Sequence, residues 1–186
     1  MFRRDHVPIR YRIAVLLALI VLIAPLSDAL GFDGSRRGFV LGLGGGFGGL
    51  FAFSKDAAGA NGQGVLTELV VGHGVSDQWL VHYSGRQIWG SREGILYTAI
   101  FPSIGVTHYN GLKSPSIYEM GSIGLAAAGD VAFEGGGGGA EGVAGFVGIG
   151  YETSRHFGFE LVGGVLSSGV NGTYGIVGLA MKALAY

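Results

Sequence analysis

Large apolar residues alternate with small or polar ones along most of the chain. In the stretch from Gly38, the even positions are mostly glycine and the odd positions include Phe39, Leu41, Leu43, Phe47, Phe51 and Phe53. This period of two residues is that of a β-strand, whose successive side chains point to opposite faces, and it differs from the 3.6-residue period of a helix. The pattern predicts a strand over about 38–53 with one large apolar face.

Similar alternation recurs seven more times, at about 64–74, 78–89, 94–108, 116–128, 142–152, 155–167 and 172–186. The intervening segments alternate in kind. Counted from the N-terminus, the odd-numbered segments include the long connections (54–63, 90–93, 129–141 and 168–171). The even-numbered segments are mostly short turns (75–77, 109–115 and 153–154). An even number of strands with short turns on one side and longer loops on the other is typical of outer-membrane barrels.

The two faces of these strands differ in polarity. Charged and hydrogen-bonding residues share one face, and we expect them to form a polar network in the lumen that comprises Glu68, His82, Ser84, Arg86 and Glu160. If residue 74 faces residue 78 in the second hairpin, Glu68 lies opposite Ser84, with Arg86 one diagonal step away. The other face carries Phe39, Val81 and Leu161. A soluble barrel has the inverse arrangement, with apolar residues inside.

Aromatic residues lie near both ends of the strands. Trp79, Tyr151, Phe157 and Phe159 are beside short turns, and Phe51, Phe53, Trp89, Tyr97 and Tyr174 are beside longer connections. Aromatic girdles at two membrane interfaces produce this distribution.

Composition narrows the class of protein further. Only 13% of the 186 residues are charged, against roughly 25% in soluble domains. The formal net charge is -1 and there is no cysteine, which excludes disulfides, thiolate metal sites and cysteine nucleophiles. There is also no basic surface for nucleic acid. Low charge is expected where lipid replaces water around the wall.

The N-terminal residues have the order of a secretory signal. Four arginines within residues 1–12 precede the apolar run Ile13–Leu26, and small residues follow up to Ala29. At about 1.5 Å per residue, such a helix spans only about 21 Å, short of the roughly 30 Å membrane core. We therefore expect a cleaved signal helix over 1–29, rather than a permanent anchor, and a barrel domain over 30–186.

The mature chain resembles the small eight-stranded outer-membrane barrels of Gram-negative bacteria, the OmpA-type and opacity-protein-like group. The resemblance rests on GFVLGLGGGFG (38–48), on GIGYETSRHFGFELVGG (148–164) and on the aromatic terminus Tyr186. It implies an antiparallel up-and-down transmembrane β-barrel that contacts outer-membrane lipid and lipopolysaccharide. It also implies that the barrel-assembly machinery recognises the last strand through Tyr186.

Two residues depart from this pattern. Lys182 falls where the family has an apolar residue, so either Lys182 extends to the periplasmic interface or the last strand is shifted by one residue. Pro102 cannot donate a ladder hydrogen bond, which predicts a bulge or an early end of the fourth strand.

His82-Tyr83-Ser84 is the sharpest catalytic candidate. The motif resembles the His-x-Ser of outer-membrane lipid A deacylases, and Glu93 could supply their downstream glutamate. In this chain, however, the alternation points His82 and Ser84 inward, which favours a polar pair in the lumen over catalysis.

The sequence predicts no cofactor and no metal site, since His73, His108 and His156 are widely separated and lie near turns. Eight strands enclose a lumen that side chains fill. We expect a structural or surface-interaction protein with loops outside, above all 129–141, whose binding partner is unknown. The alternatives are a lipid A-modifying hydrolase and a narrow channel.

Overall fold

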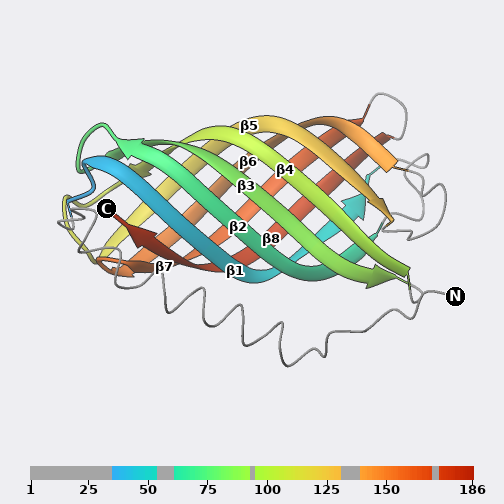
Figure 1. Ribbon diagram of the computed structural model, residues 1–186, viewed down its shortest axis with the longest axis horizontal. Coiled ribbons are helices and arrows are strands. Elements are labelled where there is room, and N and C mark those ends of the chain that lie inside the picture. The colour runs from blue at the N-terminus through green and yellow to red at the C-terminus, as the bar shows by residue number, and fades with distance from the viewer. Residues whose placement is uncertain (1–34, 54–60, 93–94, 131–138, 169–171) are drawn as a thin grey trace, which may run out of the picture. The chain divides into compact units, whose positions relative to one another are not determined.

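The computed structural model describes residues 35–53, 61–92, 95–130, 139–168 and 172–186, which form a closed β-barrel (Figure 1). Its strands are β1 (Gly38–Ala52), β2 (Gly62–Gly74), β3 (Trp79–Arg92), β4 (Ile95–Tyr109), β5 (Ser116–Asp130), β6 (Gly139–Ser154), β7 (Phe157–Ser168) and β8 (Gly172–Ala185). Each strand pairs antiparallel with its sequence neighbours, and β8 pairs with β1. The predicted eight-stranded antiparallel barrel is confirmed.

The strands tilt strongly around the ring (Figure 1). A ladder that leaves β1 at Phe39 passes through all the other strands and returns to β1 at Gly49, ten residues farther along. Such a stagger is what a closed ring of tilted strands requires. In the described parts of the chain, no helix has the length and apolar character needed to cross a membrane. The predicted signal helix over 1–29 lies outside the described residues.

Several strands extend beyond their predicted ends. On the side of the longer connections, β3 continues to Arg92, β5 to Asp130, and β6 begins at Gly139, so the loop predicted at 129–141 is partly strand. At the opposite end, β6 continues through the predicted turn at 153–154, with a bulge between Glu152 and Ser154. The composition of these segments predicted turns, but ladder pairing with the neighbouring strand continues through them.

The predicted register of β2 and β3 was wrong by two residues. The amide of Val75 donates to the carbonyl of Trp79 at 2.9 Å, which lengthens the turn and pairs Gly74 with Leu80 instead of Gln78. Glu68 therefore lies directly opposite Arg86. A shift of two residues keeps every side chain on its predicted face, because the strand period is two.

The strand pairing and burial also test the predictions made for Lys182 and Pro102. Met181 and Leu179 face outward and Lys182 is buried in the lumen, so the interface position for Lys182 was wrong and the alternation of β8 is shifted by one residue. At Pro102, β4 neither ends nor shifts register. Its ladder to β5 only skips Phe101 and Pro102 and resumes at Ser103 in the same register.

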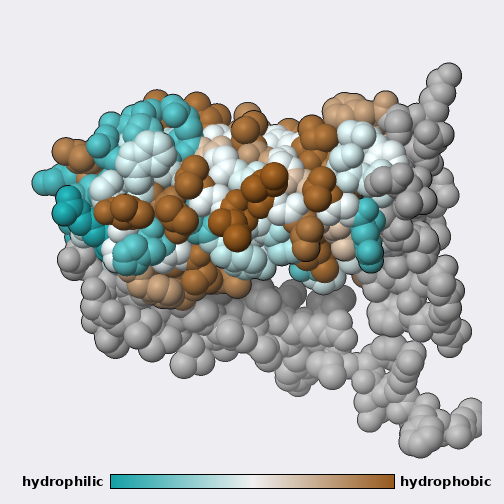
Figure 2. Space-filling view, turned by 90° about the horizontal axis from the view of Figure 1, so that it is seen from above, coloured by the Kyte–Doolittle hydropathy of each residue, from teal (hydrophilic) through white to brown (hydrophobic). Residues whose placement is uncertain are grey.

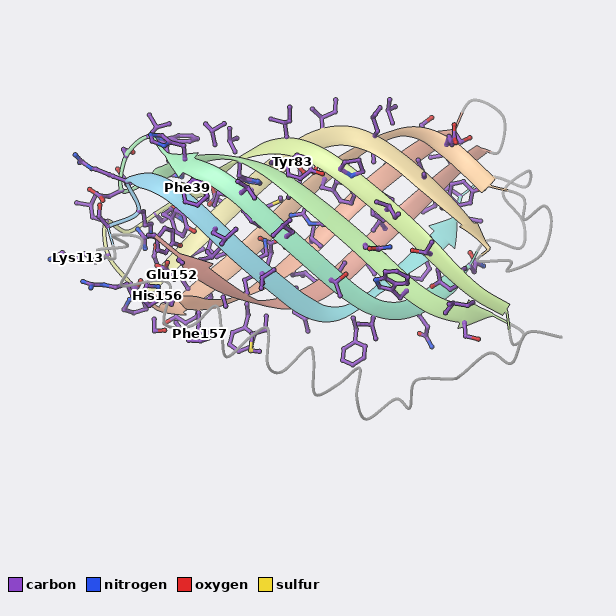
Figure 3. All side chains as sticks on the ribbon, viewed as in Figure 1. Phe39, Tyr83, Lys113, Glu152, His156 and Phe157 are labelled. Atoms are coloured by element: carbon purple, nitrogen blue, oxygen red, sulfur yellow. The ribbon has the colours of Figure 1, made fainter. Side chains whose placement is uncertain are left out.

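The barrel wall is apolar on its outside. Val147 and Ile123 are 71% and 72% exposed, and Phe39, Val81 and Leu161 are about half exposed. Figure 2 shows hydrophobic side chains spread over the visible wall, with hydrophilic residues gathered at the left end, where the short turns lie. Figure 3 shows the labelled side chains of Phe39 and Tyr83 on this wall.

Most of the aromatic residues near the strand ends point outward, which is the orientation that girdles require. Seven of the nine aromatic residues face outward: Phe51, Phe53, Trp79, Trp89, Tyr151, Phe157 and Phe159. Tyr97 and Tyr174 instead point into the lumen, with exposures of 7% and 6%. They lie beside the longer connections as predicted, but they occupy inward positions of β4 and β8.

Inward glycines make room for large side chains in the narrow lumen. A Cβ added at Gly62 would lie 2.5 Å from Cζ of Tyr97, and one at Gly164 would lie 2.5 Å from Cδ1 of Phe146. The outward Gly163 lacks this constraint, since a Cβ there would meet no described atom closer than 4.0 Å. Gly62 and Gly164 are therefore needed for packing aromatic rings inside a small ring of strands.

Candidate functional site

The lumen is filled at successive levels along the barrel axis. Towards the longer connections lies an apolar cluster that includes Leu50, Ile88, Phe101, Phe146 and Leu166. The rings of Phe101 and Phe146 meet edge to face, with centroids 5.4 Å apart. The sequence predicted only a polar network in the lumen, so this large apolar cluster is an addition to the predicted interior. The inward positions of β3, β4 and β6 carry large apolar residues near the loops.

Next to the apolar cluster, four charged side chains form a buried quartet: Glu68, Arg86, Glu160 and Lys182. Nη2 of Arg86 lies 2.8 Å from Oε1 of Glu68 and 3.3 Å from Oε1 of Glu160. Nζ of Lys182 lies 2.8 Å from Oε2 of Glu68 and 2.6 Å from Oε2 of Glu160. Each cation contacts both carboxylates and each carboxylate contacts both cations, so the four formal charges cancel.

The β-ladder itself assembles most of this quartet. Lys182, Gly44, Glu68 and Arg86 are successive partners across β8, β1, β2 and β3. A Cβ at Gly44 would lie 3.2 Å from Cβ of Glu68, so the glycine leaves space for the two ions on either side of it. The fourth member, Glu160, lies on β7 and is paired with Ala180 of β8. The guanidinium carbon of Arg86 also lies 5.2 Å from the ring centroid of Phe146, which joins the quartet to the apolar cluster.

His82 and Ser84 lie in the lumen, and each has a hydrogen-bond partner on β4. Nε2 of His82 lies 3.1 Å from Oγ1 of Thr107, and Oγ of Ser84 lies 2.9 Å from Oγ of Ser103. Nη1 of Arg86 donates to Oγ of Ser84 at 3.4 Å. The structure thus brings Glu68, Arg86 and Glu160 together, with Ser84 at their edge, and gives His82 a different partner. Glu93, the third residue of the catalytic alternative, lies outside the described residues.

At the short-turn end, Arg36 inserts its side chain into the lumen. Its guanidinium pairs with the carboxylate of Glu152, and its Nη1 donates to the carbonyls of Asp77 at 2.9 Å and Gly111 at 2.6 Å. It also lies over the ring of Tyr109, 4.0 Å from the centroid. Burial by itself lowers the pKa of Arg36, but the hydrogen bond and charge of Glu152 outweigh that effect and raise the pKa above its ordinary value.

The C-terminal residue joins the same cluster. The hydroxyl of Tyr186 donates to Oε1 of Glu152 at 3.0 Å and lies 2.9 Å from the hydroxyl of Tyr109. Oγ of Ser114 donates to Oε2 of Glu152 at 2.5 Å. Burial raises the pKa of Tyr186, so its hydroxyl keeps its proton and remains a donor. Glu152 therefore accepts hydrogen bonds from Arg36, which precedes β1, and from Tyr186, which follows β8.

His108 and His156 have local partners at the short-turn end. Nδ1 of His156 lies 2.8 Å from the carbonyl oxygen of Leu184, and Figure 3 places His156 near Glu152 at this end. The ring of His108 lies against Trp79, with centroids 4.5 Å apart. Within the described ranges, no three histidine, cysteine, aspartate or glutamate residues form a group that could hold a metal ion.

Sequence reasoning missed Lys182 and Arg36 as members of these clusters. The outward series Val177, Leu179 and Met181 could have placed Lys182 in the lumen, because strand alternation fixes its face. Arg36 precedes the first alternating segment, so no periodicity reports where its side chain points.

Comparisons with known proteins agree with the geometry of the barrel. Neisserial surface protein A has a TM-score of 0.56 and 11% identity, over 79% of this chain and 97% of that one. Ail, the attachment invasion locus protein of Yersinia pestis, has a TM-score of 0.57 and 13% identity, over 80% of this chain and 99% of that one. The chain has the fold of these small eight-stranded barrels. No family model matches the sequence, and no curated protein matches it.

Proposed function

We propose that the chain is an outer-membrane β-barrel protein with a structural or surface-interaction role. The observation that carries this proposal is the contrast between wall and lumen. Large apolar side chains cover the outside of the ring, while charged pairs and an apolar cluster fill its inside. Water solvates such a wall poorly and lipid solvates it well. The fold shared with known surface barrels supports the same conclusion.

In this proposal the N-terminal signal directs export, and the wall contacts outer-membrane lipid and lipopolysaccharide. The connections opposite the short turns face the exterior, where a partner binds. The assembly machinery receives the chain through β8 and Tyr186. Because the side chain of Tyr186 is buried in the closed barrel, this recognition takes place before β8 pairs with β1.

No observation favours the two alternative functions. A hydrolase needs a base within hydrogen-bond reach of its nucleophile, and His82 and Ser84 each bond to a different residue. A channel needs a continuous polar path, and the apolar cluster around Phe101 and Phe146 interrupts it.

Cell fractionation combined with surface labelling tests the proposal. We expect the protein in the outer-membrane fraction, with a gel mobility that changes when the sample is boiled, because closed barrels resist detergent. An epitope inserted between Asp130 and Gly139 should bind antibody on intact cells. The matched insertion at Leu112–Lys113, in the turn between β4 and β5, should bind only after permeabilisation. Recovery of the protein in the soluble fraction with no mobility change would contradict the proposal.

A further inference from the structure

We propose that Arg36 is a latch that closes the short-turn end of the lumen after the ring of strands is complete. Arg36 lies outside the strands, just before β1, yet it is 4% exposed. Its backbone crosses directly over β2 at Gly74, where any Cβ would collide with the carbonyl group of Arg36. The absence of a side chain at Gly74 thus lets the segment enter the barrel mouth.

The partners of Arg36 come from distant parts of the ring. Two are backbone carbonyls, in the β2–β3 turn at Asp77 and in the β4–β5 turn at Gly111. The others are Glu152 on β6 and the ring of Tyr109 on β4. A guanidinium offers five donors in a rigid planar fork, against three on the ammonium group of lysine, so Arg36 can reach the carboxylate of Glu152 and both carbonyls at once.

The latch also joins the two flanks of the barrel sequence. Glu152 pairs with Arg36, which precedes β1, and accepts a hydrogen bond from Tyr186, which follows β8. These three residues meet only when β8 has paired with β1 and β6 is in place. The contact therefore forms after closure and should slow unfolding without speeding folding.

The neighbouring residue provides a matched control. Arg37 pairs with Asp77 at 3.0 Å, but its side chain is 67% exposed. An exposed pair of this kind contributes little to stability, whereas the loss of one partner from a buried pair leaves an uncompensated charge. Arg36→Met and Arg37→Met thus remove the same type of side chain from adjacent positions, one inside the barrel mouth and one outside it.

The first measurement is the unfolding rate of the purified full chain in detergent, diluted into urea and followed by tryptophan fluorescence. We expect Arg36→Met to unfold at least about tenfold faster than the unsubstituted protein, with an unchanged folding rate, and Arg37→Met to stay within about twofold. Arg36→Lys keeps the charge but loses the fork, and should give an intermediate rate. If Arg36→Met does not fold, Arg36→Lys and Glu152→Gln provide the same comparison.

The second measurement tests whether water-soluble reagents can enter the lumen of the folded barrel. A substitution that only lowers stability elsewhere is not expected to open the lumen in this way. The chain has no cysteine, so Thr107→Cys gives a unique thiol at a buried lumen position beside His82. In this background, Arg36→Met should speed reaction with a small water-soluble maleimide at least about tenfold, and Arg37→Met should not. Equal labelling and equal unfolding rates for the two methionine variants would overturn the proposal, whether or not the protein resides in the outer membrane.

Discussion

Lys182→Met removes one of the four charges in the quartet and leaves the other three in place. Glu68 and Glu160 would then share Arg86 alone, and the oxygens that face Lys182 at 2.8 Å and 2.6 Å would lose their cation. Methionine has a similar length and leaves little cavity, so the effect reports mainly on charge.

The magnitude follows from burial. All four side chains of the quartet have exposures of 8% or less, so solvent cannot compensate the missing charge. Removing one partner from a buried ion pair destabilises a protein by about 3–5 kcal/mol. The double variant Lys182→Met/Glu160→Gln removes one charge of each sign and keeps the Arg86–Glu68 pair at 2.8 Å. We expect it to be more stable than Lys182→Met alone, by at least about 1 kcal/mol.

Equilibrium urea unfolding of the barrel in detergent micelles or lipid measures these differences. Lys113→Met is the matched control, because Lys113 is exposed in the turn between β4 and β5. Its effect should stay within about 0.5 kcal/mol. The electrostatic reasoning is refuted if Lys182→Met is as stable as Lys113→Met, or if the double variant is as unstable as the sum of its two single variants.

Three further outcomes are expected. Gly164→Ala should destabilise the barrel by about 1–3 kcal/mol in urea unfolding, because its methyl group would collide with the ring of Phe146. Gly163→Ala, on the outer face, should have little effect, and equal losses would refute this packing argument. In planar bilayers the purified protein should give no conductance steps over repeated insertions, since the apolar cluster fills the lumen, and regular steps would show an open path. Mass spectrometry should find the same lipid A acylation in cells with the protein, in cells without it and in cells with the His82→Ala/Ser84→Ala variant. A loss of acyl chains that depends on the protein would support the hydrolase function instead.

The candidate residues were only partly predictable. The alternation placed Glu68, Arg86 and Glu160 on the lumen face, and the structure finds them there in contact with one another. Lys182 was not added to this group, because the resemblance to known barrels favoured an apolar residue at its position. The sequence predicted a polar network in the lumen, and the apolar cluster beside it became visible only when the inward residues of all described strands were combined.

The sequence by itself determined the number of strands, the face of most side chains and the apolar wall. It could do so because a strand repeats every two residues and a one-residue slip would turn the whole apolar face into the lumen. Only the tertiary structure decided which residues meet. A two-residue slip preserves every face, so the pairing of Glu68 with Arg86 depends on the geometry of one turn. The contacts of Glu160 with Arg86, and of Glu152 with Arg36 and Tyr186, depend on the stagger with which the ring closes. That stagger is a property of all eight strands together, and no local segment of the sequence encodes it.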